Sequence, residues 1–180
     1  MSAFRLGLTG SIGMGKSATA ALFRAERIPV WDADAAVHRL YAPGGAAVGP
    51  LGALRPQAVR DSGIDRESLK AWIAQEPDAL ARIEAVVHPL VAADRAAFLN
   101  ASTSDIVVLD IPLLFEKGTE AEMDAVLVVT APPDVQRARV LARSQGLDRD
   151  GHVQASIIDA RLRAIQQRWR EMQADAQNTR

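Results

Sequence analysis

The chain has 180 residues, of which 48% are hydrophobic and 24% charged, a composition that suits one compact globular domain with a sizeable core. The formal net charge of -1 gives no overall basic field, which argues against a protein that binds nucleic acid or anionic membranes over its whole surface. Cysteine is absent, which excludes disulfides, thiolate zinc sites and thiol nucleophiles.

The sequence also contains no sign of a membrane or secretory segment. The first residues, "MSAFRLGLTGS", lack a long apolar core, and no run approaches the roughly 18 apolar residues that a membrane-spanning helix needs. We therefore expect a soluble, cytoplasmic protein.

The first half of the chain alternates between strands and helices and then turns helical. We expect strands over residues 4–9 and in "IPVWDAD", the first followed by an alanine-rich helix and the second by a helix over residues 35–41. Residues 42–67 are rich in Gly and Pro, so they should hold loops with room for one short helix, rather than a sheet strand. From residue 67 to 101 apolar residues recur at helical steps, and Pro77 and Pro89 should end or kink those helices.

The second half resumes the strand signal. Residues 106–109 and 126–129 are nearly continuous apolar runs, which indicates strands covered on both faces. A helix that opens at the prolines of "PPDVQRARVLAR" follows, then a polar loop and a helical pattern at the C-terminus. The predicted fold class is α/β, a three-layer sandwich with a parallel sheet flanked by helices.

The loop after the first strand carries the most specific signal. "GSIGMGKS", Gly10 to Ser17, matches G-x-x-x-x-G-K-[ST] in full and lies between a predicted strand and a predicted helix. Its glycines allow positive φ angles, so backbone N–H groups can point at phosphate oxygens beside the positive end of the helix. Lys16 would supply a charge for the β- and γ-phosphates, and Ser17 a hydroxyl for Mg²⁺. The alternative, a glycine-rich turn before an exposed lysine, is disfavoured by this context.

The rest of the sequence favours a small-molecule kinase over a GTPase. No N/T-K-x-D motif for reading guanine is present, and "DRDG" at residues 148–151 follows a helix rather than an apolar strand. "DAD", Asp32 to Asp34, follows the second predicted strand, at the edge where α/β proteins place their ligands. A carboxylate there could accept a proton from an attacking hydroxyl or help to hold the metal, and it could equally be a helix N-cap.

Acidic and basic residues further along fit the same kind of site. "VVLD" places Asp110 at the end of a strand, as in a Walker B motif, and "IPLLFE" puts a proline-stiffened turn and Glu116 beyond it. Arg139 and Arg143 lie one turn apart on the predicted helix after the last strand. Like charges at that spacing repel unless an anion lies between them, and a solvated basic face is the alternative.

In combination, "GLTGSIGMGKS", "VWDAD", "GIDRESL", "VVHP" and "DIPLLFE" resemble the dephospho-CoA kinase family, from about Leu6 to Arg143. The phosphate loop alone fits many families, whereas "DIPLLFE" together with D-x-D and the His-Pro step is specific. The resemblance implies a P-loop kinase of the nucleoside-monophosphate-kinase type, with a helical substrate-binding region and a small lid. It also implies that ATP, with Mg²⁺, phosphorylates the ribose 3′-hydroxyl of dephospho-CoA, the last step of coenzyme A synthesis.

The resemblance assigns expected roles to individual residues. Asp34 would be the general base, Arg139 and Arg143 would neutralise charge on the transferring phosphoryl group together with the catalytic Lys16, and Ser17 and Asp110 would hold the metal. For His88 a packed or capping role is the alternative. The nucleotide would be bound by Gly10, Ser11, Ile12, Gly13, Met14, Gly15, Lys16, Ser17 and Ala18. The substrate would be bound by Asp34, His38, Arg66, His88, Pro112, Leu113 and Glu116.

Two features depart from the family pattern. His38 stands where the family usually has arginine, so a substrate contact there would depend on pH near neutrality, unless His38 is simply exposed. At the C-terminus "IIDARLRAIQQRWREMQADAQNTR" replaces the family's last strand, which is therefore expected to be missing. Either a long helix over about residues 150–174 covers the sheet differently or docks on another subunit, or the adenine pocket is weakened.

We expect a single kinase domain over residues 1–180. Its core would comprise residues 1–41 and 104–143, its helical substrate-binding region residues 42–103, and its lid loop and C-terminal helix residues 144–180. Two alternatives to an active dephospho-CoA kinase stay open: a nucleotide-binding protein with impaired turnover because of its altered C-terminus, and a P-loop kinase of another small acceptor. No nucleic-acid or membrane partner is expected, and a monomer and a homo-oligomer both remain open.

Overall fold

The fold was obtained as a computed structural model, which describes residues 3–116 and 118–144. Contacts divide the chain into two compact units, Met1–Thr9 with Ser17–Val128 and Gly10–Lys16 with Val129–Arg180. The expected long C-terminal helix, and the position where the family's last strand would stand, lie outside the described residues.

A parallel sheet forms the centre of the first unit. Its strands are β1 (Phe4–Thr9), β2 (Val30–Asp32), β5 (Ile106–Asp110) and β6 (Ala125–Val128), in the order β2-β5-β1-β6. Val107, Val108 and Leu109 of β5 are at most 1% exposed, as the apolar run of this strand predicts. The predicted α/β class with a parallel sheet flanked by helices is confirmed.

The edge strand β6 differs from the expectation of a strand covered on both faces. Leu127 and Val128 are 37% and 45% exposed. Among the residues that the structure describes, no strand pairs with the outer edge of β6.

The first helix, α1 (Lys16–Ala25), ends in a left-handed turn without a glycine. Arg27 has a φ of 61°, and two backbone bonds close the turn, from Arg27 N–H to Arg24 O at 3.0 Å and from Ile28 N–H to Phe23 O at 3.0 Å. This is the hydrogen-bond pattern of a Schellman motif, in which glycine is the usual residue at the left-handed position. The turn leads the chain directly into Pro29 and β2.

Helices and a small hairpin make up the region between β2 and β5. The helices are α2 (Ala33–Tyr41), α3 (Val48–Leu54), α4 (Arg66–Gln75) and α5 (Ala79–Ala101), with a 3₁₀ turn at Pro56–Ala58. The strands β3 (Val59–Arg60) and β4 (Gly63–Ile64) form an antiparallel hairpin, so the expectation that residues 42–67 hold no sheet strand is wrong. Asp61 and Ser62 form its tip with φ angles of 50° and 63°, the positive values of a tight hairpin turn.

The helical region has its own apolar core. Leu51, Ala58 and Trp72 are at most 1% exposed at its centre, and Leu40, Leu69, Ile83 and Val87 pack with them. Burial of Leu51 explains why α3 forms in a segment rich in Gly and Pro, since packing outweighs weak helix propensity.

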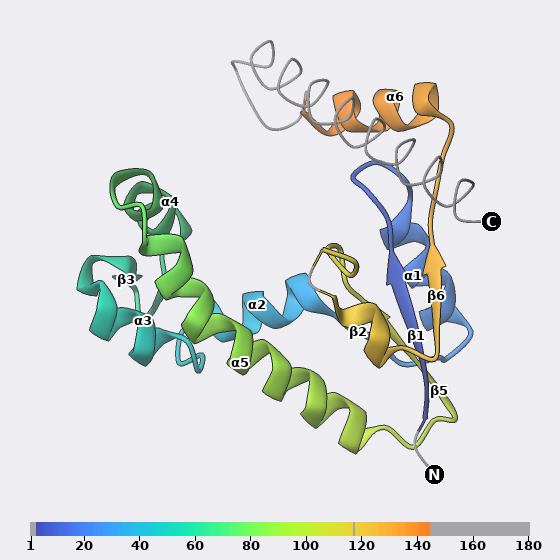
Figure 1. The fold of residues 1–180 in the computed structure, drawn as a ribbon, viewed down its shortest axis with the longest axis horizontal. Coiled ribbons are helices and arrows are strands. Elements are labelled where there is room, and N and C mark those ends of the chain that lie inside the picture. Colours follow the sequence, from blue (N-terminus) through green and yellow to red (C-terminus); the bar gives the residue numbers. More distant parts are fainter. Residues whose placement is uncertain (1–2, 117, 145–180) are drawn as a thin grey trace, which may run out of the picture. The chain divides into compact units, whose positions relative to one another are not determined.

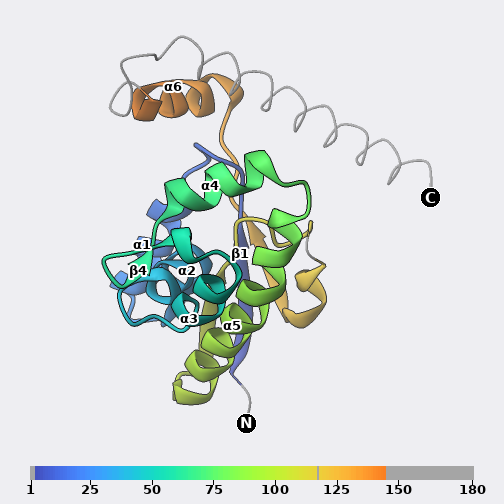
Figure 2. The same ribbon diagram turned by 90° about the vertical axis from the view of Figure 1, so that its left-hand side faces the viewer.

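The long helix α5 joins this core to the sheet. Its N-terminal part supplies Ile83 and Val87 to the helical core, and its C-terminal part packs Phe98 and Leu99 against the cluster around Trp31. Figure 1 shows α5 (green) running from the helical group toward β5, and Figure 2 shows α2, α3 and α4 beside it. Pro77 separates α4 from α5 as predicted, whereas Pro89 lies inside α5 and does not end it.

In the second unit, α6 (Pro133–Ser144) accompanies the phosphate loop. The predicted opening of this helix at its prolines is confirmed, because Pro133 is its first residue.

Candidate functional site

The phosphate loop has positive φ angles that favour glycine at Gly13 and Gly15. Gly13 has a φ of 78°, and a Cβ there would lie 2.7 Å from Val140 Cγ2 and 2.9 Å from the backbone oxygen of Gln136. Gly15 has a φ of 105°, and a Cβ there would lie 3.4 Å from Nη1 of Arg139. The loop is therefore closely wrapped at Gly13, where conformation and space together call for glycine, whereas at Gly15 conformation alone favours it.

Residues of α6 hold the carbonyl side of this loop. Gln136 Nε2 donates to the Ile12 carbonyl at 2.8 Å, and Arg139 Nη1 donates to the carbonyls of Gly13 and Met14, each at 3.3 Å. Within the loop, Met14 N–H donates to the Ser11 carbonyl at 3.2 Å. Three successive loop carbonyls are thus bound by side chains of one helix face.

The end of the loop begins a helix, as the motif requires. Lys16 is the first residue of α1, and Ser17 and Ala18 follow in its first turn, where both are exposed. The N-terminus of an α-helix carries a partial positive charge, which adds to the charge of Lys16. Lysine, hydroxyl and helix terminus are the groups that bind phosphate and its metal in P-loop proteins.

Two acidic residues end neighbouring strands in the first unit. Asp32 of β2 and Asp110 of β5 are register partners, and Asp110 is only 2% exposed. Asp32 Oδ1 accepts from Ala35 N–H at 3.0 Å, so Asp32 is the N-cap of α2. Arg24 Nη2 lies 4.0 Å from Asp32 Oδ2. The N-cap alternative for the D-A-D motif is therefore correct for its first aspartate, while the second, Asp34, is exposed in the first turn of α2.

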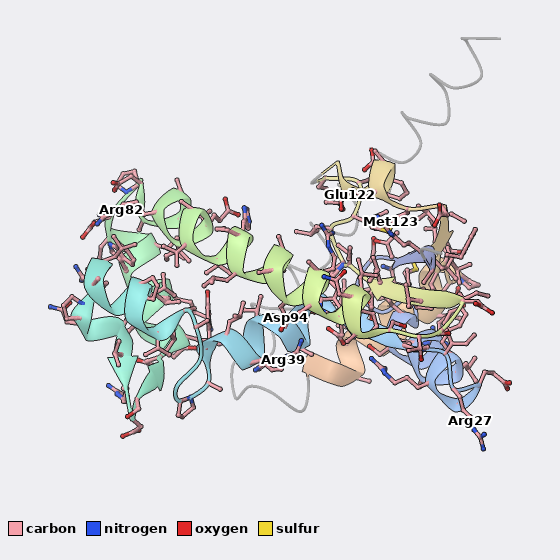
Figure 3. All side chains as sticks on the ribbon, turned by 90° about the horizontal axis from the view of Figure 1, so that it is seen from below. Arg27, Arg39, Arg82, Asp94, Glu122 and Met123 are labelled. Atoms are coloured by element: carbon pink, nitrogen blue, oxygen red, sulfur yellow. The ribbon has the colours of Figure 1, made fainter. Side chains whose placement is uncertain are left out.

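A polar network fixes α2 against α5. Asp94 of α5 accepts from Trp31 Nε1 at 2.7 Å and from Arg39 Nη2 at 2.6 Å, both on Oδ1. Figure 3 shows Arg39 and Asp94 pointing toward each other from the two helices. Burial alone would raise the pKa of Asp94, but the hydrogen bonds from Arg39 and Trp31 outweigh it and lower the pKa. Because α2 carries Asp34, this network holds the helix on which the predicted base stands.

The turn after β5 is tied to the end of β1. Thr9 Oγ1 donates to the Pro112 carbonyl at 3.1 Å, which brings the "IPLLFE" turn to the carboxyl end of the sheet. Leu113 is 53% exposed and Glu116 is also exposed, whereas Leu114 is fully buried. An exposed apolar side chain beside an exposed carboxylate can contact a ligand, so the predicted substrate role of this turn stays a prediction.

The predicted substrate residues of the helical region are exposed. The guanidinium of Arg66 lies 5.8 Å from the centre of the Tyr41 ring. Burial raises the pKa of Tyr41, and the positive charge of Arg66 partly opposes that rise. His88 is 54% exposed with Nε2 3.7 Å from Glu84 Oε1, so it is neither packed nor a cap. His38, in the last turn of α2, is exposed, which was one of the two alternatives considered for it.

Gln136 and Asp94 were not among the residues predicted from the sequence. Gln136 is 1% exposed and shares one face of α6 with Arg139 and Val140, a spacing that could have identified it. Asp94 carries no local signal, because its partners Arg39 and Trp31 are 55 and 63 residues away in the sequence. Arg143 lies in the last turn of α6, and its side chain is outside the described residues.

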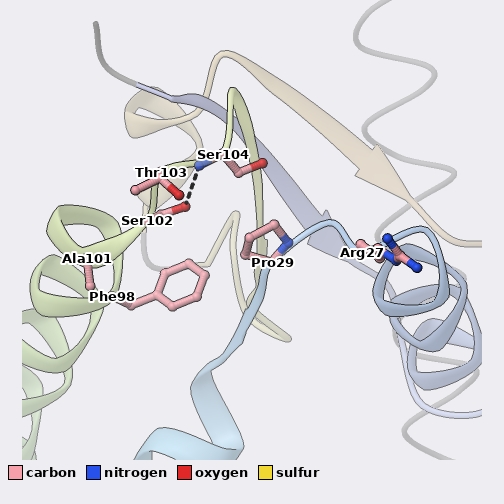
Figure 4. Close-up of a pocket in the computed structure, with 7 residues that line it drawn as sticks. All are labelled: Arg27, Pro29, Phe98, Ala101, Ser102, Thr103 and Ser104. Carbon is pink, nitrogen blue, oxygen red and sulfur yellow. Dashed lines mark hydrogen bonds between the residues drawn. The ribbon is translucent and has the colours of Figure 1, made fainter.

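A cavity of about 410 Å³ lies at the other end of the strands. It is bordered by Pro29, which precedes β2, and by the segment from Ala101 to Ser104, which precedes β5 (Figure 4). The Phe98 ring and Arg27 also line it. Among the predicted site residues, Asp110 is the last residue of β5 and Asp34 follows the carboxyl end of β2, so this cavity is separate from them.

Two negative findings apply to the part of the chain that the structure describes. It contains no group of three or more His, Asp or Glu side chains that could hold a metal ion. None of its helices combines the length and apolar character needed to cross a membrane.

A family model and the named relatives point to the same family. The sequence model of the family described as dephospho-CoA kinase matches residues 4–176, so the match extends beyond Arg143. Proteins named dephospho-CoA kinase are similar to the chain: one from Cereibacter sphaeroides is 71% identical over 79% of this chain and 73% of its own length. One from Ruegeria pomeroyi is 64% identical over 78% of this chain and 71% of its own length. A crystal structure from Thermus thermophilus, 38% identical, covers 91% of this chain and 81% of its own with a TM-score of 0.75.

Proposed function

The chain belongs to the dephospho-CoA kinase family, and from this membership and the loop geometry we propose that it transfers the γ-phosphoryl group of ATP to the ribose 3′-hydroxyl of dephospho-CoA. The products would be coenzyme A and ADP. The observation that carries the proposal is the loop Gly10–Lys16, wrapped by its glycines with its carbonyls held by α6. A kinase of this family acts in the last step of coenzyme A synthesis, and a cytoplasmic location stays part of the proposal.

The loop would bind the phosphates of ATP. Backbone N–H groups and the N-terminus of α1 supply partial positive charge, and Lys16 supplies a full one. Phosphoryl transfer depends mainly on positioning and on spreading of negative charge over such groups. Arg139, already beside the loop, would add charge next to the phosphates, and Arg143 stands one turn further along α6.

The acceptor hydroxyl needs a base, and Asp34 is the residue proposed for it. It lies in the first turn of α2, immediately after Asp32 caps the helix and Trp31 anchors the strand. An exposed carboxylate on a helix held at both ends can accept the ribose proton while the phosphoryl group is transferred. Residues of the "IPLLFE" turn, with Arg66, His38 and His88, would contact the rest of dephospho-CoA.

The donor atoms present fit Mg²⁺ bound together with ATP. The hydroxyl of Ser17 and the carboxylate of Asp110 are hard oxygen donors, and Mg²⁺ is usually held by one or two protein groups plus substrate phosphates and water. A three-residue cage is not needed for such a metal, which agrees with the absence of one among the described residues. When bound, Mg²⁺ would neutralise charge on the β- and γ-phosphates.

A direct assay of product tests the proposal. The purified chain is incubated with ATP, Mg²⁺ and dephospho-CoA, and coenzyme A is measured by chromatography. Lys16→Ala should lower the rate by at least about a hundredfold, because it removes a full charge from the phosphates. Asp34→Asn should lower it by roughly a hundredfold or more, because it removes the base.

Two matched variants serve as controls. Lys70→Ala removes an exposed lysine of α4 that pairs with Glu67, and Asp61→Asn changes an exposed aspartate at the hairpin tip. Both should keep the wild-type rate. Wild-type chain that binds ATP but forms no coenzyme A would refute the proposed reaction and would indicate a nucleotide-binding protein instead.

A further inference from the structure

A buried polar side chain lies behind the phosphate loop. Gln136 is 1% exposed, and its Nε2 donates to the Ile12 carbonyl at 2.8 Å. Its Cγ and its backbone oxygen lie 3.2 Å and 2.9 Å from the position that a Cβ on Gly13 would take, so it also fills the space beside that glycine. A buried amide is costly unless it is hydrogen-bonded, which makes this contact specific rather than incidental.

The contact has a consequence for the direction of the loop amides. A peptide unit is planar and trans, so a carbonyl and the N–H of the next residue point in opposite directions. When α6 holds the carbonyls of Ile12 and Met14, the N–H groups of Gly13 and Gly15 are directed away from α6. These are amides that a phosphate-binding loop presents to its ligand.

Gln136 and Arg139 contribute differently to this arrangement. The bond from Gln136 is short and comes from a buried side chain, whereas the two bonds from Arg139 are 3.3 Å long and come from an exposed residue. Water competes for an exposed guanidinium and much less for a buried amide. Gln136 is therefore the stronger constraint on the loop backbone.

We infer that Gln136 is a positioning residue of the phosphate loop, which aims the amide of Gly13 at the ATP phosphates by holding the Ile12 carbonyl of the same peptide unit. The inference rests on the proposed function in one respect, namely that this loop binds ATP. Gln136 would affect nucleotide binding through the loop backbone, without touching the reacting atoms.

The test is the variant Gln136→Met, which keeps the length of the side chain and removes the donor. We expect the Kd of ATP, measured by titration calorimetry, to rise roughly three- to tenfold, the factor that corresponds to one lost hydrogen bond. The KM for ATP should rise by the same factor, while the KM for dephospho-CoA stays unchanged. Gln75→Met, at the exposed end of α4, is the matched control and should alter neither constant.

The outcomes separate the inference from the proposed function. Wild-type chain that fails to bind ATP refutes the function, whereas wild-type binding with an unchanged Kd in Gln136→Met refutes the inference. A lower melting temperature with unchanged nucleotide constants also refutes it, because a purely structural role would have that effect. Should the variant not fold, NMR of the wild-type chain decides: the side-chain amide signal of Gln136 must shift on addition of ATP and that of Gln75 must not.

Discussion

Replacing Arg27 by glycine should make the chain more stable. Arg27 holds a φ of 61° after α1, where a side chain costs about 1–2 kcal/mol relative to glycine. Glycine also raises the conformational entropy of the unfolded chain, which offsets about 0.4–1 kcal/mol of the stabilisation gained by relieving this cost. Arg27 is exposed, so little packing is lost, and the backbone bonds of the turn do not involve its side chain. The expected net gain in unfolding free energy is about 0.5–1 kcal/mol.

Thermal unfolding followed by circular dichroism measures this gain. For a chain of this size, 1 kcal/mol corresponds to about 2–4 °C, so the midpoint should rise by roughly 1–4 °C. Arg27→Ala is the control, because it removes the charge and keeps the Cβ, and it should melt close to the wild type. The reasoning is refuted if Arg27→Gly melts no higher than the wild type. It is equally refuted if Arg27→Ala gains as much, since loss of charge would then be the cause.

Three further substitutions test other parts of the structure. Asp94 has a pKa below its ordinary value, so its stabilising contribution is complete above about pH 4 and is lost as the pH falls through the folded-state pKa. Asp94→Asn should lower the free energy of unfolding at neutral pH by roughly 1 kcal/mol. In urea unfolding, the variant should also lose less stability than the wild type as the pH is lowered below about 4. The same loss of stability at acid pH in both proteins would contradict this. Leu51→Ala, at a fully buried position, should cost about 2–5 kcal/mol by the same urea measurement, and a cost below 1 kcal/mol would mean that the helical core is loosely packed. Gly13→Ala should weaken ATP binding by at least about tenfold in calorimetry, because its Cβ would lie 2.7 Å from Val140, and an unchanged Kd would show that the loop adapts.

Local signals in the sequence predicted the sheet and the phosphate loop. Runs such as Val107 to Leu109 are apolar without interruption, and a buried parallel strand requires that pattern. The loop was predictable because G-x-x-x-x-G-K-[ST] places conformation and charge at fixed spacing between a strand and a helix.

The features that were missed depend on partners distant in the sequence or on packing. The β3–β4 hairpin has strands of two residues each and a tip of Asp61 and Ser62, which is too short and too ordinary in composition to stand out. Pro89 was expected to end or kink a helix, and it does not end α5, which packs into a core on each side of it. Asp94 becomes recognisable only when Trp31 and Arg39 are seen beside it.

The helix α5 gives the helical region and the sheet a shared element. Ile83 belongs to one core and Phe98 to the other, and Val91 contacts both. Unfolding of either core therefore removes packing from the same helix, which makes the two regions open together more often than separate helices would allow. In hydrogen exchange, a ligand that orders the helical region should slow amide exchange in the turns of α5 near the sheet as well. The exchange rates of the amides around Phe98 would then fall when a ligand binds to the helical region, although these amides do not contact that ligand.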